Sequence, residues 1–330
     1  MIRKLIPAVA VLAAMGSAHA DADLSFYGLG DLSYGKNELV SDKDARFHSG
    51  GDDGGNGGGS QGNSTTRIGL KGGMDIGNGL KANFALESAE IDHDLRMGRN
   101  SKALFNRQAW AGISGGFGEA RFGRQDSVAF QTMVAYDFNG ASNAATALGN
   151  ATVAPWLRGR QTQSLQYISP TFGGGLKAQV GFAAKEDGVD DAKSSTSAAL
   201  TYTAGKFAAT VTGETKREKA GFHDSDFGAV AGSYDFGVVK VMAGYADGGS
   251  DRRGTSLGIV APVAGFNIGL MYGKNSDTKD EATEFFINRE IFKNTYAYLD
   301  YGYVNFNDSS DKKAYALGVI YVFDLKLIGR

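Results

Sequence analysis

Apolar and polar residues alternate strictly along many segments of this chain. In LKANFALE, residues 80–87, the side chains of Phe84 and Leu86 fall on one side of an extended chain and Lys81 on the other, because side chains in a strand point alternately to opposite faces. The preceding stretch 75–79, DIGNG, contains the glycine and asparagine that tight hairpins use. The pattern predicts a β-hairpin with one apolar and one polar face.

The same alternation recurs along the chain and predicts about sixteen antiparallel strands, an even number as in bacterial outer-membrane barrels. We expect these strands at 24–34, 64–74, 80–90, 102–114, 118–127, 161–169, 175–184, 195–204, 206–216, 224–235, 237–247, 253–261, 266–273, 281–290, 293–306 and 314–323. Short connections such as 75–79 alternate with longer polar ones such as 36–63. Short turns at one end and long loops at the other are typical of such a barrel.

These two-faced strands suit a closed transmembrane barrel. In lipid every backbone N–H and C=O needs an internal partner, and a sheet without edges provides one for each. The apolar faces would then contact lipid, and the polar faces would line a water-filled lumen, because about sixteen strands enclose a space too wide for side chains to fill. The alternative is a β-sandwich with the apolar faces packed between two sheets. Strand length and the aromatic residues near strand ends favour the membrane barrel.

The N-terminal residues 1–20 have the three parts of a secretory signal peptide. Arg3 and Lys4 are followed by an apolar segment, 5–15, and by an A-x-A cleavage site that ends at Ala20. We therefore expect the mature barrel to span 21–330. A short buried helix at a true N-terminus is the alternative.

The composition excludes several classes of protein. Aromatic residues make up 11% of the chain and the formal net charge is −2, whereas disordered chains lack aromatics and nucleic-acid-binding proteins are expected to be basic. No run of about 18 apolar residues, the length of a helical membrane span, follows residue 20. An exported chain without cysteine must rely on backbone hydrogen bonding and packing instead of disulfides.

The last expected strand, 314–323, has the sequence AYALGVIYVF. One face carries Tyr315, Leu317, Val319, Tyr321 and Phe323. This pattern resembles the closing strand of outer-membrane proteins, which normally end at the terminal aromatic residue. Here residues 324–330 follow, so the register of the last strand stays open.

The long connection 127–159 is rich in small residues, and connections of this kind are more often functional or folded inward than idle. The chain resembles the general porins of Gram-negative bacteria, in particular the trimeric sixteen-stranded type of β-proteobacteria. The motifs that carry the resemblance are TRIGLKG, GNGLKANFALE, LFNRQAWAGISGGFGEARFGRQ and QSLQYISPTFGGGLKAQVGF. The resemblance implies a homotrimeric passive diffusion channel in the cell outer membrane, in contact with its lipid and lipopolysaccharide.

In porins of this type the third long loop folds into the barrel, narrows it and faces a ladder of basic residues. By motif, the resemblance places three residues of this chain on the ladder: Arg67 of TRIGLKG, Arg107 of NRQAWAG and Arg160 of GRQTQS. To these we add Arg121, which shares the polar face of its expected strand with Glu119.

On the loop, Asp137 of YDFNG would take the acidic position of the constriction, whereas Met133 stands where enterobacterial relatives have a second acid and Leu29 where they have a lysine. Cations would therefore outnumber acids at the constriction. Charges of one sign in a low-dielectric wall concentrate the opposite ion, and arginine stays ionised at any relevant pH. We expect a channel for ions and small hydrophilic solutes that prefers anions.

Other functions stay open as alternatives. A channel selective for phosphate or an organic acid would show saturable flux, and a surface adhesin barrel would not conduct. Each lumenal arginine could instead simply pair with a neighbouring carboxylate. An enzyme is not expected, because His48, His93 and His223 lie in expected loops and outside recognisable catalytic motifs. The glycine-rich stretch 50–62 lacks the ending of a phosphate-binding loop, and the loop acids lack EF-hand spacing, so neither a cofactor nor a metal is expected.

Overall fold

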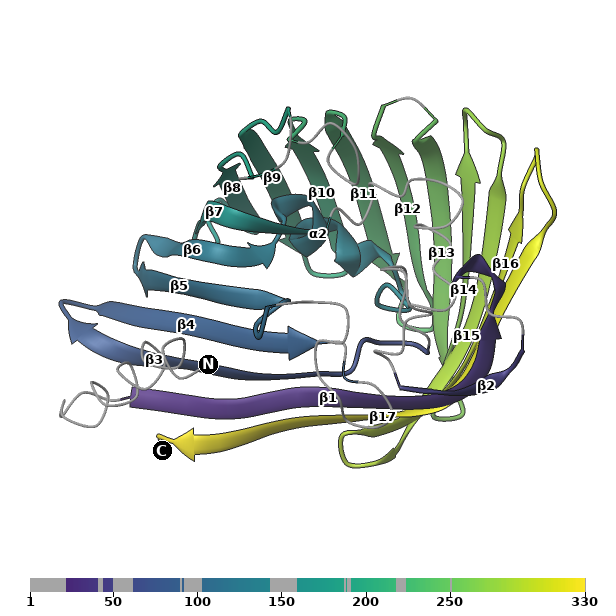
Figure 1. Ribbon diagram of the computed structural model, residues 1–330, viewed down its shortest axis with the longest axis horizontal. Coiled ribbons are helices and arrows are strands. Elements are labelled where there is room, and N and C mark those ends of the chain that lie inside the picture. The colour runs from purple at the N-terminus through teal and green to yellow at the C-terminus, as the bar shows by residue number, and fades with distance from the viewer. Residues whose placement is uncertain are drawn as a thin grey trace.

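The computed structural model describes residues 22–40, 44–49, 62–89, 91, 103–142, 159–186, 188, 191–217, 224–249 and 251–329. The signal peptide expected at 1–20 lies outside these ranges. The strands of the described chain form one 17-stranded antiparallel sheet (Figure 1). Within the same ranges, no helix is long and apolar enough to cross a membrane.

The strands follow one another around the sheet in chain order. Their bounds are β1 (Ala22–Asn37), β2 (Arg46–Ser49), β3 (Arg67–Gly77), β4 (Leu80–Ala89), β5 (Gln108–Gly115), β6 (Gly118–Asp126), β7 (Arg160–Ile168), β8 (Leu176–Ala183), β9 (Ser195–Ala204), β10 (Phe207–Glu214), β11 (Phe227–Asp235), β12 (Lys240–Asp247), β13 (Arg253–Val263), β14 (Phe266–Asn275), β15 (Glu281–Phe292), β16 (Thr295–Asn305) and β17 (Lys312–Ile328). Three short helices join them: η2 (Glu38–Val40), α2 (Val128–Met133) and η3 (Val134–Tyr136).

Strand β1 closes the barrel. It pairs with β17 from Leu24 opposite Ile328 to Asn37 opposite Ala314, and its first half also pairs with β3. Further along, β1 pairs with the short strand β2, from Leu32 opposite Ser49 to Gly35 opposite Arg46. The predicted all-β antiparallel barrel of about sixteen strands is therefore confirmed, with β2 as one additional strand.

The tight turn between β3 and β4 shows why its residues are glycine and asparagine. Gly77, Asn78 and Gly79 all have positive φ angles, of 89°, 55° and 73°. Residues with a Cβ rarely adopt this left-handed backbone conformation, which glycine and, to a lesser degree, asparagine tolerate. The turn joins β3 and β4 into the predicted hairpin, which pairs antiparallel from Arg67 opposite Ala89 to Gly77 opposite Leu80.

The structure differs from the sequence-based expectation at several strand ends. Strand β5 begins at Gln108, six positions after the expected start at 102, because residues 104–107 form a bend. Strand β17 continues through Phe323 to Ile328, since β1 offers backbone partners along the whole of that length. The register left open by the sequence is thereby given, with Phe323 opposite Gly28. Neither β2 nor α2 was expected.

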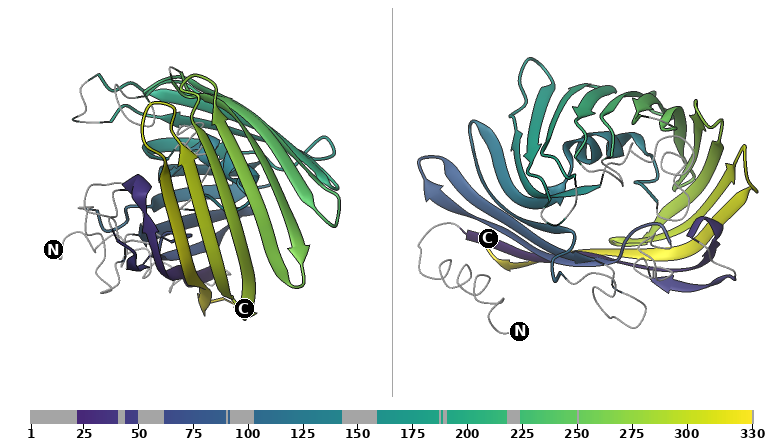
Figure 2. Two further views of the ribbon diagram at one scale, coloured as in Figure 1. Left: turned by 90° about the vertical axis from the view of Figure 1, so that its right-hand side faces the viewer. Right: turned by 45° about the horizontal axis from the view of Figure 1, so that its top comes forward.

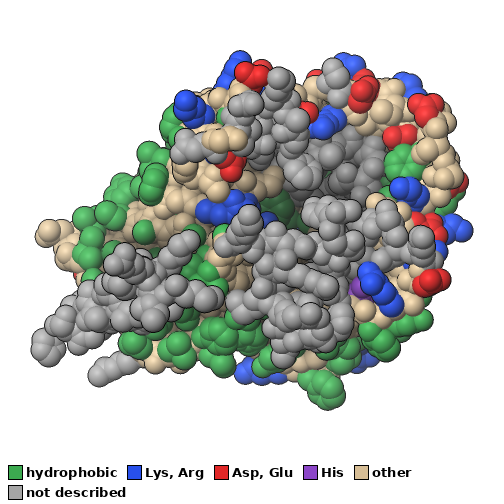
Figure 3. All heavy atoms as spheres, viewed as in Figure 1, with side chains coloured by type: hydrophobic (Ala, Val, Ile, Leu, Met, Phe, Trp, Pro, Cys, Tyr) green, Lys and Arg blue, Asp and Glu red, His purple; other side chains and the backbone are tan. Residues whose placement is uncertain are grey.

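The outer face of the barrel is apolar. Large side chains exposed there include Leu32, Phe122, Leu165, Leu257 and Leu317. In Figure 3, hydrophobic side chains cover the left and lower flanks, whereas charged side chains gather mostly along the upper and right rims. Alternating inward positions on β1 carry the buried polar residues Asp31 and Ser33. This is the arrangement expected of strands that contact lipid outside.

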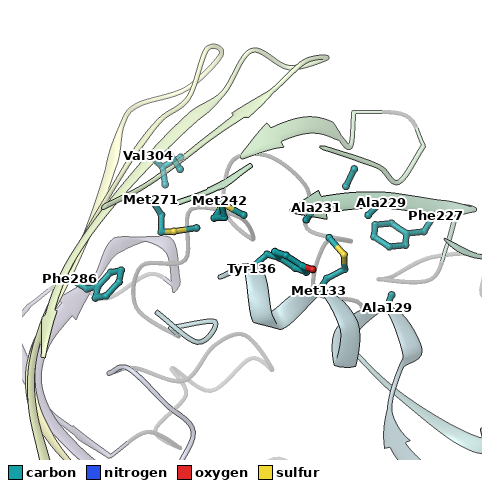
Figure 4. Close-up of a cluster of buried hydrophobic side chains, with 12 residues drawn as sticks. Ala129, Met133, Tyr136, Phe227, Ala229, Ala231, Met242, Met271, Phe286 and Val304 are labelled. Carbon is teal, nitrogen blue, oxygen red and sulfur yellow. The ribbon is translucent and has the colours of Figure 1, made fainter. Parts of the chain in front are cut away.

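Part of the inner wall is nevertheless apolar. Ala129, Met133 and Tyr136, from α2 and η3, pack inside the barrel in one cluster with nine side chains of strands β11 to β16 (Figure 4). Those are Phe227, Ala229, Ala231, Met242, Ala246, Met271, Ala282, Phe286 and Val304. The expectation that the inward face as a whole meets water was therefore wrong for this sector. Burying a large apolar side chain stabilises a fold by about 1.5–3 kcal/mol. This cluster therefore holds α2 and η3 against the wall.

Candidate pore constriction

The connection between β6 and β7 enters the barrel as an inward segment, residues 127–142, which begins at the capped N-terminus of α2. The hydroxyl of Ser127 caps α2 by accepting a hydrogen bond from the Phe130 N–H at 3.1 Å. The Ser127 N–H donates to the carbonyl of Gly159 at 3.1 Å, which ties the two ends of the connection together. The teal coil of α2 lies within the ring of strands (Figure 2, right). The part of the connection at 127–142 is thus inside the barrel, and 143–158 lies outside the described residues.

Polar contacts tether the far end of this segment. The Nδ2 atom of Asn139 donates to Glu284 Oε1 at 2.6 Å and to Asp300 Oδ1 at 3.0 Å. Ser142 Oγ donates to Asp300 Oδ2 at 2.8 Å. Tyr136 Oη donates to Thr210 Oγ1 at 3.0 Å, and burial raises the pKa of this phenol, which keeps it a proton donor. The segment is therefore fixed on the wall formed by β10, β15 and β16.

Three of the expected arginines gather on the wall formed by β3 to β7. Arg107 Nε donates to Glu87 Oε1 at 2.5 Å, and Arg67 Nε lies 3.9 Å from Glu87 Oε2. Arg160 Nε lies 3.0 Å from Asp126 Oδ1. Arg107 is close enough to repel both other guanidinium groups. The structure therefore brings Arg67, Arg107 and Arg160 together.

Arg124 joins the same group. Its Nε donates to the carbonyl of Asn106 at 2.6 Å, and its charge acts on Arg160. We call Arg67, Arg107, Arg124 and Arg160 the arginine cluster. A register shift between Gly123 and Gln125 interrupts the alternation of β6 at this point, so the direction of Arg124 could not be inferred from period-two spacing.

Sequence reasoning also missed the two carboxylates that hold the cluster, Glu87 and Asp126. Glu87 is buried, with 3% of its surface exposed. The alternation places it on the polar face of its strand, but the arginine that it meets depends on the pairing of β3 with β4 and of β4 with β5. That pairing was the missing information.

The other two expected site residues lie outside this cluster, Arg121 on β6 and Asp137 on the inward segment. Arg121 Nη2 donates to Glu119 Oε2 at 2.6 Å, and its guanidinium carbon lies 4.4 Å from the centroid of the Trp110 ring. Asp137 is buried, accepts a hydrogen bond from the Asn139 N–H at 3.1 Å and acts electrostatically on Asp300. It therefore belongs to the tethered end of the segment.

The wall opposite the inward segment has an excess of positive charge. Glu87 is the carboxylate beside Arg67 and Arg107, and Asp126 is the carboxylate beside Arg160. The three guanidinium groups of Arg67, Arg107 and Arg160 thus share two carboxylates. Such a surface attracts anions and presents fixed N–H donors to them. Within the described ranges, no group of three His, Asp or Glu residues is placed to hold a metal ion.

Comparison with known families gives one match over most of the chain. Residues 8–309 match the family described as Gram-negative porin. Outer membrane porin protein 32 of Delftia acidovorans is 29% identical, over 96% of this chain and 94% of that protein. Major outer membrane protein P.IB of Neisseria meningitidis serogroup B is 32% identical over 46% of this chain and 43% of its own.

Solved structures show the same fold. The anion-selective porin from Comamonas acidovorans superposes with a TM-score of 0.71 at 22% identity, over 92% of this chain and 100% of that chain. The trimer form of OmpT from Vibrio cholerae superposes with a TM-score of 0.62 at 16% identity, over 92% of this chain and 99% of that chain. At these identities the likeness concerns the fold.

Proposed function

The chain belongs to the Gram-negative porin family, and from that premise we propose that its channel passes anions more readily than cations. The proteins that it resembles are channels of the outer membrane, and this chain is a passive diffusion channel of that membrane. The observation that carries the anion preference is the arginine cluster, in which Arg67, Arg107 and Arg160 share Glu87 and Asp126 in the described part of the wall.

The constriction in this proposal lies between the arginine cluster and the inward segment. Arg67, Arg107 and Arg160 supply the positive wall, Arg121 extends it along β6, and Asp137 supplies negative charge on the segment. Complete neutralisation by local ion pairs is the competing interpretation. The counts speak against it, because Arg67 and Arg107 share the single carboxylate of Glu87. The porin of Comamonas acidovorans that shares this fold is anion-selective, which agrees with the proposal.

The double variant Arg67→Glu with Arg160→Glu tests the proposal. In planar bilayers across a KCl gradient, the reversal potential should move from the chloride side towards the potassium side. The reason is that two negative charges replace two positive ones and, together with Glu87 and Asp126, dominate the wall. Arg253→Glu is the matched control. Arg253 is half exposed and pairs with Asp277 at 2.5 Å, away from the cluster, so its reversal of charge should leave the potential in place. An unchanged potential in the double variant contradicts the assignment.

We also propose that the protein is a homotrimer surrounded by outer-membrane lipid and lipopolysaccharide. The existence of a trimer form of the OmpT barrel supports this assembly. Sedimentation of the detergent-solubilised protein should give three copies per particle, and a monomer would refute the proposal. N-terminal sequencing of the protein from outer membranes should begin at Asp21 if residues 1–20 are removed on export.

A further inference from the structure

A cavity of about 550 Å³ lies between the inward segment and the inner wall of β6 to β12. Arg121 and Asp126 line one side of it, and Phe130 and Tyr136 of the inward segment contribute to its lining. The rest is wall. This volume is that of a site for a small organic molecule.

The wall of the cavity is a surface of hydroxyl groups at strand spacing. Lys177 pairs with Thr201, and Thr201 with Thr210, across three neighbouring strands. The Oγ1 atoms of Thr201 and Thr210 are 2.9 Å apart and share a hydrogen bond. Thr203 and Ser233 lie in the next row towards the short turns and also line the cavity. Each hydroxyl can donate once and accept twice, so these groups retain capacity for a ligand.

Two amines stand at opposite sides of this surface. Lys177 belongs to β8 and Lys240 to β12, and both line the cavity. In the part of the chain that the structure describes, neither forms an ion pair with a carboxylate, while Lys240 Nζ lies 5.1 Å from the Phe138 ring centroid. Four strand spacings separate their strands, which is about 19 Å along the wall. Two amines so far apart suit an elongated molecule better than a single compact ion.

Two lysines of β3 and β4, across the lumen from this cavity, do have carboxylate partners. Lys71 Nζ lies 2.6 Å from Asp324 Oδ2, and Lys81 Nζ lies 2.5 Å from Asp23 Oδ2. These side chains are about half exposed, and each of the two lysines has a carboxylate beside it. Within the described ranges Lys177 and Lys240 have no carboxylate beside them, so their charge is available for a solute.

We propose that this cavity is a binding subsite for small polyhydroxylated carboxylates of the sugar-acid class. A lysine ammonium would bind the carboxylate, the hydroxyls of Thr201, Thr203 and Ser233 would exchange hydrogen bonds with those of the solute, and Phe130 would cover its C–H groups. The inference deepens the proposed anion-preferring channel and rests on it. An aliphatic carboxylate without hydroxyls would use only the lysine ammonium of the site. A polyol without charge would use only the hydroxyl groups.

Three probes of similar size separate these contributions. Gluconate carries a carboxylate and hydroxyls, hexanoate carries the carboxylate alone, and sorbitol the hydroxyls alone. In planar bilayers bathed in KCl, block of the chloride current by each probe gives a half-blocking concentration. We expect gluconate to block at a concentration about tenfold lower than either other probe, since a charged hydrogen bond and several neutral ones act together.

Variants place the site on the wall. Lys177→Gln and Lys240→Gln should each raise the half-blocking concentration of gluconate, and together by about tenfold. Lys81→Gln is the matched control, because it removes an ion-paired lysine from the opposite side of the lumen, and it should leave the block unchanged. Unaltered migration of the folded oligomer in detergent gels checks that each variant assembles.

The outcomes separate the subsite from the channel's selectivity. Equal block by gluconate and hexanoate, or block that survives both lysine substitutions, overturns the subsite while a chloride preference would still stand. Cation preference of the unmodified channel combined with gluconate block that is lost in the lysine variants would overturn the proposed selectivity and support the subsite.

Discussion

Two sectors of the inner wall face the same lumen and have opposite character. Strands β3 to β7 present the arginine cluster with its two carboxylates, whereas strands β11 to β16 present Phe227, Met242, Met271 and Phe286. Ala129, Met133 and Tyr136 of the inward segment pack in one cluster with the second sector, and this cluster does not include the first. The difference teaches that an inward position in a wide barrel need not be wet, because the chain's own segment decides which part of the wall remains for water and ions.

The largest effect on stability should come from truncating a large side chain of the apolar sector. Phe286 is fully buried, and Gly269 on the neighbouring strand leaves room for its ring. We expect Phe286→Ala to lower the free energy of unfolding by about 3–5 kcal/mol through the lost contacts and the cavity that remains. Denaturant titration in detergent measures this. Retained chloride preference in the folded variant would show that this sector only holds the segment, and a reversed preference would break the division between the sectors.

A smaller effect is expected at the tether between the sectors. Asn139→Ala removes the amide that donates to both Glu284 and Asp300, which leaves two buried carboxylates with fewer donors. The loss should be about 1–3 kcal/mol in unfolding free energy, together with a higher single-channel conductance as the segment loosens. Thr278→Ala, a turn residue whose hydroxyl donates to Asp280, is the control. Unchanged conductance in Asn139→Ala would mean that the apolar cluster alone fixes the segment.

Sequence reasoning recovered the repeating part of the fold and missed the parts that do not repeat. Period-two alternation located the strands, because each long strand contains several repeats of the two-residue period. The four residues of β2 and the six of α2 are too short for a period to stand out. Met242 and Met271 did carry a signal, since they occupy inward positions among polar neighbours, and this is where the inward segment packs.

The site was predictable as a set of arginines and not as a geometry. Motifs named Arg67, Arg107 and Arg160, which the structure places together. Their shared partners were not predictable, because Glu87 meets Arg67 and Arg107 through strand register and through the late start of β5. The register shift at Gly123 likewise hid Arg124. Interruptions of a regular pattern come from tertiary packing, which a local period does not contain.

The smallest effect is expected for an exposed ion pair on β4 that is not part of the arginine cluster. Lys81→Gln breaks the contact with Asp23, whose side chain is about as exposed as that of Lys81. Exposed pairs contribute about 0–1 kcal/mol, so the denaturation midpoint should barely move and the reversal potential should shift slightly towards the cation side. A shift as large as that of the arginine variants would show that charge anywhere in the lumen sets selectivity, and the distinction between the sectors would fail.

The most direct test is the reversal potential of the unmodified protein across a KCl gradient in a planar bilayer. The excess of guanidinium over carboxylate groups in the arginine cluster predicts the sign of a chloride-preferring channel, and the magnitude should fall as salt increases and screens the cluster. A potential of the opposite sign, from a channel that prefers potassium, would contradict the account.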